Sequence, residues 1–426
     1  MKPLTFVVQR LSCVALLILG SALSAAAQDP PPPHPSDALF NPDVVQRIDL
    51  RVHTADWEKL KQNFQENTYY PADLVWNGNV VRNVGIRSRG SGSRSGTKPG
   101  LRVDFDKYSA DLSFLEEKSL VFDNLTQDPS GIHETVAMRL FAKLGIPAPR
   151  ETHMRLYVND EYIGLYAIVE SIDKQFLARV YGVIGEDTQN DGYLYEFNYV
   201  DPWTFGYLGS EFEAYALRFD PKTHEKESDV QKFGPIENVV RLVNELPIEQ
   251  FNSLLNEHLD LQSFMRFLAA QNFVGENDGF LGYEGVNNFY FYRKENSSQH
   301  VFIAWDEDNA FWGPEYPIDF RLQDNVLTRK AMQVPELRDT YYNVLGEAMR
   351  LADEPTGPDG LTWLEFEIRR QADMIADAMR EDPSKPYTFD QHETARAHMI
   401  SFARGRSRYV SEQMGASQGQ ASRRRP

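Results

Sequence analysis

Cysteine is almost absent from this chain of 426 residues, in which Cys13 is the only one. A single thiol cannot form an intramolecular disulfide, and thiolate metal centres need several cysteines. Cysteine catalysis in the folded body and thiolate metal sites are therefore excluded. A chain of this length can bury a core large enough to be stable without disulfides.

Long apolar runs are absent beyond the N-terminal segment. That segment has a basic start at Lys2 and Arg10, an apolar stretch at 11–23 and small residues at 24–27. The stretch is too short for a transmembrane helix, and the pattern is typical of a secretory signal peptide over 1–27. We therefore expect export to the periplasm, the cell surface or the medium, with no transmembrane segment in the mature chain.

The chain also lacks an excess of basic residues. It has 44 Lys and Arg against 62 Asp and Glu, which gives a formal net charge of −18. Loss of Lys2 and Arg10 with the signal peptide would make the mature chain still more acidic. Because such a surface repels phosphate backbones, the composition argues against nucleic acid as a partner.

Composition shifts mark the expected domain boundaries. A proline-rich segment at 28–40 is predicted to be an extended linker, and a small, polar segment at 414–426 is predicted to be a disordered tail. No linker interrupts the sequence between them. We expect one continuous domain over 41–413.

The order of secondary structure predicts an α+β fold, with a strand-rich first half and a helix-rich second half. Two hairpins are expected, at 72–87 around Asn77-Gly78 and at 152–170 around Asn159-Asp160, because such turns suit twisted strands. A helix at 131–144 should end at a glycine. Two further strands are predicted at 288–293 and 300–305, and helical spacing recurs at 236–246, 248–258, 261–274, 335–351, 361–380 and 390–412.

A basic, glycine-rich stretch at 87–98 differs from the rest of this acidic chain. It contains four cationic residues and three glycines in twelve positions. Glycines allow a close approach of the backbone to a ligand, and Arg and Lys side chains suit phosphate oxygens. Arg89 is accordingly a candidate phosphate ligand. The alternative is a flexible connection between two strands.

An acidic sequence follows the apolar strand predicted at 300–305. Residues two apart on a strand share a face, so Asp306 and Asp308 could both point at one hard cation such as magnesium. The alternative is a charged strand end in solvent.

A third cluster lies at 276–279 and 287–288, between a predicted helix and a predicted strand. An Asp that accepts a hydroxyl proton and an Asn that binds a metal are the groups that phosphoryl transfer to an alcohol requires. Asn, Asp and Gly also cluster in ordinary turns, which is the alternative.

These pieces occur in an order that resembles the spore-coat protein H (CotH) kinase family. The resemblance spans roughly residues 44–312 and is most specific in the strings YVNDEYIGLYAIVE and WDED. It implies a divergent protein-kinase-like fold with two lobes. It also implies binding of ATP and magnesium and phosphorylation of hydroxyl groups, here on a protein substrate.

The resemblance also implies roles for single residues. Lys98 matches the lysine after the glycine-rich turn and would contact phosphates, and Glu170 would pair with that lysine or hold the nucleotide. Asp278 matches the catalytic aspartate.

The implied magnesium ligands follow Asp278 in the chain. Asn288 would assist the metal, and Asp306 matches the magnesium aspartate, with Asp308 beside it.

Two other functions remain open at this point. Because ATP is scarce outside the cytoplasm, the chain could be a non-catalytic surface, adhesion or coat-assembly protein that keeps a kinase-like fold. The acidic cluster alone could instead serve a metal-dependent hydrolase or a calcium-stabilised module.

Overall fold

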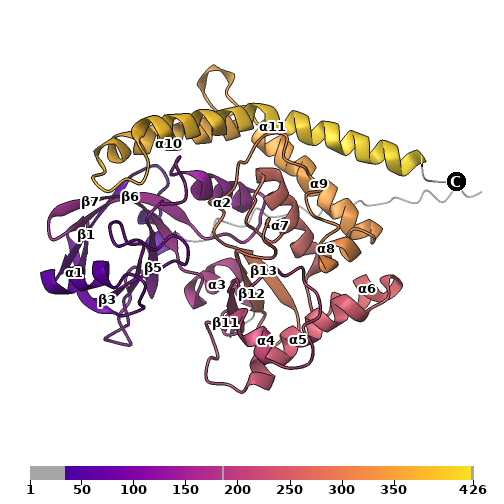
Figure 1. The fold of residues 1–426 in the computed structure, drawn as a ribbon, viewed down its shortest axis with the longest axis horizontal. Coiled ribbons are helices and arrows are strands. Elements are labelled where there is room, and N and C mark those ends of the chain that lie inside the picture. Colours follow the sequence, from indigo (N-terminus) through magenta and orange to yellow (C-terminus); the bar gives the residue numbers. More distant parts are fainter. Residues whose placement is uncertain (1–33, 185–186, 424–426) are drawn as a thin grey trace, which may run out of the picture. The chain divides into compact units, whose positions relative to one another are not determined.

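The structure is a computed structural model that describes residues 34–184 and 187–423. From Pro35 onward the described part forms one compact unit (Figure 1). The predicted signal peptide at 1–27 lies outside the described residues.

The first half of the chain forms a closed barrel. Its order is β1-β2-β3-β4-β5-β7-β6, and the parallel pairing of β1 with β6 closes it. The strands are β1 (Gln46–Val52), β2 (Tyr70–Trp76), β3 (Asn79–Ser88), β4 (Leu101–Asp104), β5 (Ser119–Asp123), β6 (Glu151–Val158) and β7 (Glu161–Glu170).

Both predicted hairpins are confirmed within the barrel. β2 and β3 are joined by Asn77 and Gly78, with φ of 48° and 78°, and β6 and β7 by Asn159 and Asp160, with φ of 52° and 68°. Two residues with positive φ match the twist of the flanking strands, which explains the choice of Asn, Asp and Gly.

The barrel core reaches further toward the N-terminus than the sequence predicts. A short 3-10 helix, η1 (Pro35–Ala38), precedes Leu39 and Phe40, which are 0% and 4% exposed and pack with the barrel strands. The predicted linker at 28–40 therefore ends in residues that belong to the folded body. Leu39 and Phe40 are therefore part of the hydrophobic core of the barrel.

A second sheet of four strands follows the barrel in the chain. Its order is β11-β10-β12-β13, and all of its pairs are antiparallel. The strands predicted at 288–293 and 300–305 are confirmed as β12 and β13. The bounds are β10 (Tyr193–Phe197), β11 (Phe219–Pro221), β12 (Phe289–Arg293) and β13 (His300–Ala304), and a separate pair consists of β8 (Val183–Ile184) and β9 (Asp187–Thr188).

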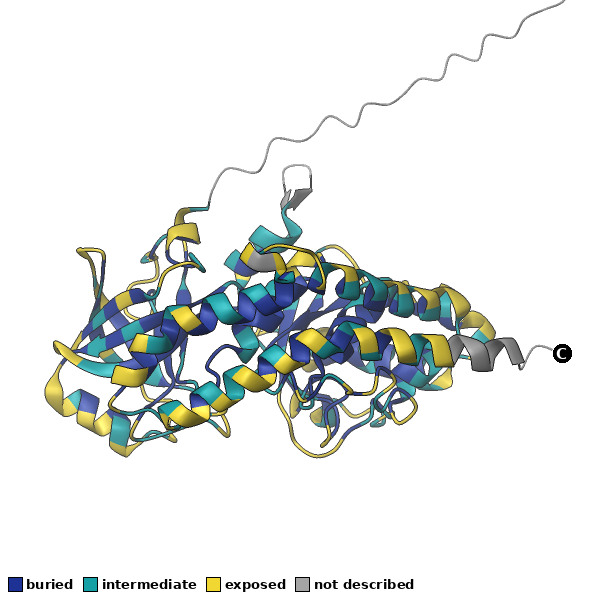
Figure 2. Ribbon diagram, turned by 90° about the horizontal axis from the view of Figure 1, so that it is seen from above, coloured by how far each residue is buried: buried dark blue, intermediate teal, exposed yellow. Residues whose placement is uncertain are grey.

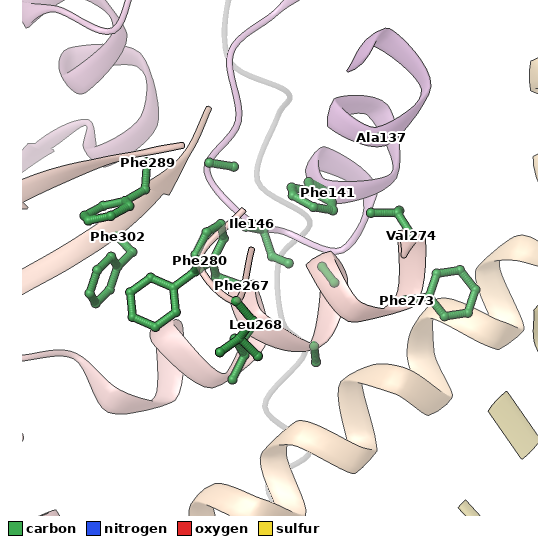
Figure 3. Packing of buried hydrophobic residues seen from close by; sticks show 14 of the residues in the cluster. Ala137, Phe141, Ile146, Phe267, Leu268, Phe273, Val274, Phe280, Phe289 and Phe302 are labelled. Atoms are coloured by element: carbon green, nitrogen blue, oxygen red, sulfur yellow. The ribbon is translucent and has the colours of Figure 1, made fainter. Parts of the chain in front are cut away.

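One face of this sheet packs on aromatic side chains. Figure 3 shows Phe280 close to Phe289 and Phe302, with Phe267 of α7 nearby. The rings of Phe280 and Phe302 are 5.1 Å apart in an edge-to-face arrangement, the geometry that aromatic pairs favour. Phe264 of α7 (Leu261–Val274) also contacts Phe302, with ring centres 5.0 Å apart, and this contact packs the second sheet against α7.

The helices gather in the second half, as predicted. α9 packs against both α7 and α11, and α10 packs against β7 of the barrel. Besides α7, the helices are α1 (Thr54–Gln62), α2 (His133–Lys143), α3 (Lys174–Tyr181), α4 (Glu213–Ala216), α5 (Asp229–Glu245), α6 (Ile248–Leu255), α8 (Val326–Ala331), α9 (Pro335–Ala352), the 3-10 helix η2 (Pro358–Gly360), α10 (Trp363–Glu381) and α11 (Phe389–Arg423).

The two long C-terminal helices are amphipathic. Figure 2 shows them with exposed residues on one side and buried residues on the other, as expected for helices that cover a core. α11 continues to Arg423, so the tail predicted to be disordered from 414 is helical over 414–423. No helix in the described ranges is long and apolar enough to span a membrane.

Candidate active site

A polar cavity of about 660 Å³ lies between the barrel and the second sheet. The end of β3 and the glycine-rich segment line one side. Residues from β10, β12 and the loops after α7 and β13 line the other. The cavity brings together Arg89, Asp278, Asn288 and Asp306, four of the seven residues that the sequence indicated.

Arginines form the barrel side of this cavity, which we call the cationic wall and define as Arg87, Arg89 and Arg94. Arg94 donates to the backbone oxygens of Gly90 and Phe64, at 2.7 and 3.1 Å. Arg87 donates to the Tyr69 hydroxyl at 3.1 Å and to amide oxygens. In the described part of the chain, neither Arg87 nor Arg94 has a carboxylate within 4.0 Å, so neutral oxygens orient their charge without cancelling it.

Arg89 points toward the acidic side of the cavity. Its Nη1 lies 3.3 Å from Asp123 Oδ2, and its guanidinium carbon lies 5.7 Å from the centre of the Trp305 ring. Burial alone would lower the pKa of Arg89, but Asp123 and Asp306 raise it above its ordinary value. Arg89 is therefore a permanent cation beside the candidate metal ligand.

Asp278 lies in the loop directly after α7. Its backbone N–H donates to Glu276 Oε1 at 2.6 Å, and its Oδ2 accepts from the side-chain amides of Asn287 and Asn288 at 3.2 Å each. Burial raises the pKa of Asp278, while the two amides favour the ionised form. The carboxylate is thus held in one orientation at the cavity, as a general base requires.

Asp306 also lines the cavity. It follows β13, which ends at Ala304, and its φ of 59° turns the chain there. Its backbone N–H donates to Glu134 Oε1 of α2 at 3.2 Å. Burial raises the pKa of Asp306 to about 6, and Arg89 opposes this rise.

Asp308 does not share a face with Asp306, which corrects the prediction made from strand alternation. The strand ends before both residues, and the positive φ at Asp306 breaks the alternation. Asp308 instead lines a second, small cavity of about 10 Å³ together with Asp123, Glu134 and Glu151.

The carboxyl groups behind the main cavity form a buried acidic cluster: Glu134, Glu151, Glu276, Glu307 and Asp308. Burial is the main cause that raises the pKa of each well above its ordinary value, with nearby carboxylates adding to the effect. Among residues 34–184 and 187–423, no group of three or more His, Cys, Asp or Glu side chains is arranged to hold a metal ion.

The structure places Lys98 and Glu170 away from the cavity. Lys98 is 2% exposed, and its Nζ forms an ion pair of 2.8 Å with Asp382, which follows α10. Glu170 forms ion pairs with Arg150 and Arg179, at 2.8 and 2.5 Å, so the expected pair of Lys98 with Glu170 is not formed. Lys98 does not line the cavity where the predicted contact with phosphates would be made.

Sequence reasoning missed several residues that line the cavity. Glu196 of β10 binds Lys222, which pulls the pKa of Glu196 below its ordinary value against the effect of burial. The buried Tyr290 lies on the neighbouring strand β12. A charged residue inside the aromatic run YLYEF was the one signal that could have revealed Glu196.

Comparison with known families identifies the family of the chain. The family model described as CotH kinase protein matches residues 86–410, a range that contains the glycine-rich segment, Asp278 and Asp306. The match covers most of the chain, so the chain belongs to the CotH kinase family, as its sequence pattern indicated.

One relative can be named. The inner spore coat protein H of Bacillus subtilis (strain 168) is 24% identical over 394 residues, which cover 88% of this chain and 99% of the relative. Among solved structures, the Helicobacter pylori proinflammatory kinase CtkA aligns with 77% of this chain and 94% of its own. That alignment has 11% identity and a TM-score of 0.30, a likeness too weak to support an argument about the fold.

Proposed function

We propose that the cavity binds ATP with magnesium and transfers the terminal phosphoryl group to a hydroxyl group of a protein. The observation that carries the proposal is the pairing of two unlike walls. Arg87 and Arg94, which have no carboxylate partner among the described residues, lie on one side of the cavity, and Asp278 and Asp306 lie on the other. The whole chain has a net charge of −18, so these cations stand out. Such a cavity suits a polyanion whose charge is partly neutralised by a cation.

The residues fit a magnesium ion. Magnesium takes one or two carboxylates and completes its shell with phosphate oxygens and water, so it does not need a cage of three acidic side chains. Asp306 would supply a carboxylate and Asn288 an amide oxygen. When bound, the ion would neutralise charge on the phosphate oxygens as the reaction proceeds.

The chain's own residues account for the rest of the reaction. Arg87, Arg89 and Arg94 would hold phosphate oxygens and stabilise the negative charge on the transferred group. The acceptor oxygen forms a bond to the terminal phosphorus as the bond to the bridging oxygen breaks. Asp278 takes the hydroxyl proton, for which its fixed carboxylate is suited. A kinase-like fold in two lobes, with the barrel as one lobe, is part of this proposal.

The proposed acceptor and location are supported by the relative and by the signal-peptide-like pattern of residues 1–27. The relative is named as a spore coat protein. We therefore propose an exported chain that acts on a protein at a coat or cell surface. If the chain binds the nucleotide without transferring phosphate, it is a coat or surface protein that keeps the fold alone.

Two measurements test the proposal. Calorimetry measures the binding of ATP in the presence and absence of magnesium, and a phosphate-transfer assay measures turnover. Binding should be stronger with magnesium, and Asp306→Asn should remove that difference together with turnover. Asp377→Asn, the same change at a side chain that is 80% exposed on α10, is the control. Equal binding with and without magnesium by the parent protein would contradict the proposal.

A further inference from the structure

The loop that carries Asp278 begins at the C-terminus of α7, whose last carbonyl groups need partners from outside the helix. α7 ends at Val274, and Gly275 adopts a φ of 69°. The carbonyl of Gln271 accepts the Gly275 N–H, and that of Val274 accepts the Phe311 N–H at 2.7 Å. Two carbonyl groups of the last turn then remain to be satisfied.

Arg406 of α11 satisfies both of them. Its Nε donates to the carbonyl of Phe273 at 2.7 Å and its Nη2 to that of Asn272 at 2.5 Å. Its Nη1 donates to the carbonyls of Pro314 and Tyr316, at 2.9 and 2.6 Å. One planar guanidinium group therefore binds both the C-terminal end of α7 and the segment that contains Pro314 and Tyr316.

This contact differs from an ordinary ion pair. Arg406 is 0% exposed, and no carboxylate in the described ranges lies within 4.0 Å of it. Burial lowers the pKa of Arg406 to about 10, so the residue stays charged at neutral pH. A buried cation is costly to desolvate, and the C-terminal end of a helix is where its charge is best stabilised.

The two segments that Arg406 holds lead to the two acids of the site. The Asn272 and Phe273 carbonyls lie a few residues before Asp278. The other segment, 311–316, follows Asp306 closely in the chain.

A direct bond also joins these segments. The Tyr316 hydroxyl donates to the Glu276 carbonyl at 2.9 Å, and Glu276 Oε1 in turn accepts the Asp278 N–H. The contacts thus run without a gap from Arg406 through Tyr316 and Glu276 to Asp278.

We propose that Arg406 is a positioning residue of the active site, which fixes the loop of Asp278 relative to the segment of Asp306. The role rests on the proposed phosphoryl transfer, because both acids matter only if that chemistry occurs. Arg406 lies outside the main cavity and acts through the two segments. Its loss should therefore affect the reaction step more than the binding of the nucleotide, which the cationic wall of the barrel would hold.

The test compares Arg406→Lys with Arg408→Lys in the full exported chain. Lysine keeps the charge but cannot donate to four carbonyl groups in one plane, whereas Arg408 is a largely exposed neighbour on the same helix. Well below the melting temperature, Arg406→Lys should lower kcat about tenfold to a hundredfold and change the KM for ATP less than about twofold. Arg408→Lys should match the parent.

Hydrogen exchange gives a second measurement that needs no activity. In Arg406→Lys, amides at 275–288 should exchange faster than in the parent, while those of the glycine-rich segment at 89–97 should not change. If Arg406→Lys does not fold, Tyr316→Phe tests the same connection, because it removes the hydroxyl bond to Glu276 alone.

Parental kcat in Arg406→Lys, or faster exchange spread evenly over the whole protein, would overturn the proposal, since either result describes a purely structural residue. If the parent transfers no phosphate, the proposed function fails. The exchange comparison then still decides whether Arg406 holds the loop.

Discussion

The two walls of the cavity are built in opposite ways. On the barrel side, Arg87 and Arg94 are held by neutral oxygens, so their positive charge is oriented and left uncancelled. On the other side, the side-chain amides of Asn287 and Asn288 donate to Asp278. The Asp306 backbone N–H donates to Glu134, and the Asp306 side chain faces the cation Arg89. Among the described residues, Arg87 and Arg94 therefore lack a carboxylate partner and Asp278 lacks a cationic one, charges that a nucleotide and a metal ion would supply.

Substitution of Asp278, on the acidic side of the cavity, should have the largest effect on activity. Asp278→Asn keeps the shape and the contacts to Asn287 and Asn288 but removes the basic oxygen. We expect kcat to fall by about 10²–10⁴, the range of general-base catalysis, while the affinity for ATP with magnesium stays close to that of the parent. Single-turnover assays and calorimetry on the same samples measure the two quantities, and a parental kcat would rule out Asp278 as the base.

Lys98 is the fourth cationic residue of the segment at 87–98, but it does not belong to the cationic wall. Because Lys98 and Asp382 are buried as a pair, Lys98→Met should leave an uncompensated carboxylate and lower the free energy of unfolding by about 3–5 kcal/mol. The affinity for ATP, measured where the variant is folded, should change little. Lys98→Met/Asp382→Asn removes the uncompensated charge and should recover part of the loss in a denaturant titration. The recovery is only partial because Leu165 and Ser384 each donate an N–H to a different oxygen of Asp382, and asparagine has one oxygen.

Arg89 should give a smaller effect, which is measured here as the affinity for ATP. Removing one charge-assisted contact to a phosphate costs about 1.5–3 kcal/mol, so Arg89→Met should weaken the binding of ATP by roughly ten- to a hundredfold. Arg82 lies on the same strand β3 with its side chain exposed, and Arg82→Met should bind ATP as the parent does. Equal affinities of the two variants would show that the arginines of the barrel do not contact the nucleotide.

The local elements could be predicted well from the sequence. α7 begins and ends where the helical spacing indicated, at Leu261 and Val274, and both hairpins form at their Asn-containing turns. These features depend on residues a few positions apart. The order of the family-like strings also pointed to Asp278 and Asp306, which the fold brings to one cavity.

Contacts between distant residues could not be predicted. Lys98 meets a partner 284 positions away, and no local pattern distinguishes it from the arginines that line the cavity. Asp308 departs from Asp306 because one residue with positive φ ends the strand alternation. The hydrogen bonds of Arg406 likewise join α11 to α7, more than 130 positions earlier in the chain. In each case the closure of the fold, and not the local sequence, sets the role of the residue.

The smallest effect concerns the pH dependence of stability in the metal-free protein. Burial raises the pKa of Asp173 to about 7 and the pKa of each acid in the buried cluster well above its ordinary value. Above pH 6.5 the folded protein therefore holds protons that the unfolded chain has released. Stability must then fall as the pH rises, because the unfolded state binds fewer protons.

Below pH 6.5 the buried histidines act in the opposite sense. Burial lowers the pKa of His153 to about 4 and that of His300 to about 3, so unfolding takes up protons there. A histidine with its ordinary pKa near 6.5 is half protonated at pH 6.5 and largely neutral above about pH 7.5, so the acids dominate the upper part of the range from pH 6.5 to 8. Each of these acids can contribute up to about 1.4 kcal/mol per pH unit, and we expect a total loss of at least about 1 kcal/mol over this range.

Denaturant titrations with a metal chelator in the buffer, at four pH values between 6.5 and 8, measure this slope. Glu151→Gln should flatten it, because burial raises the pKa of Glu151 well above its ordinary value and the glutamine cannot ionise. Glu412→Gln, at a side chain that is 61% exposed on α11, should leave it as in the parent. If the stability of the parent stays constant or rises with pH, the acids of the buried acidic cluster are already ionised. They would be ionised if a cation remained bound among them.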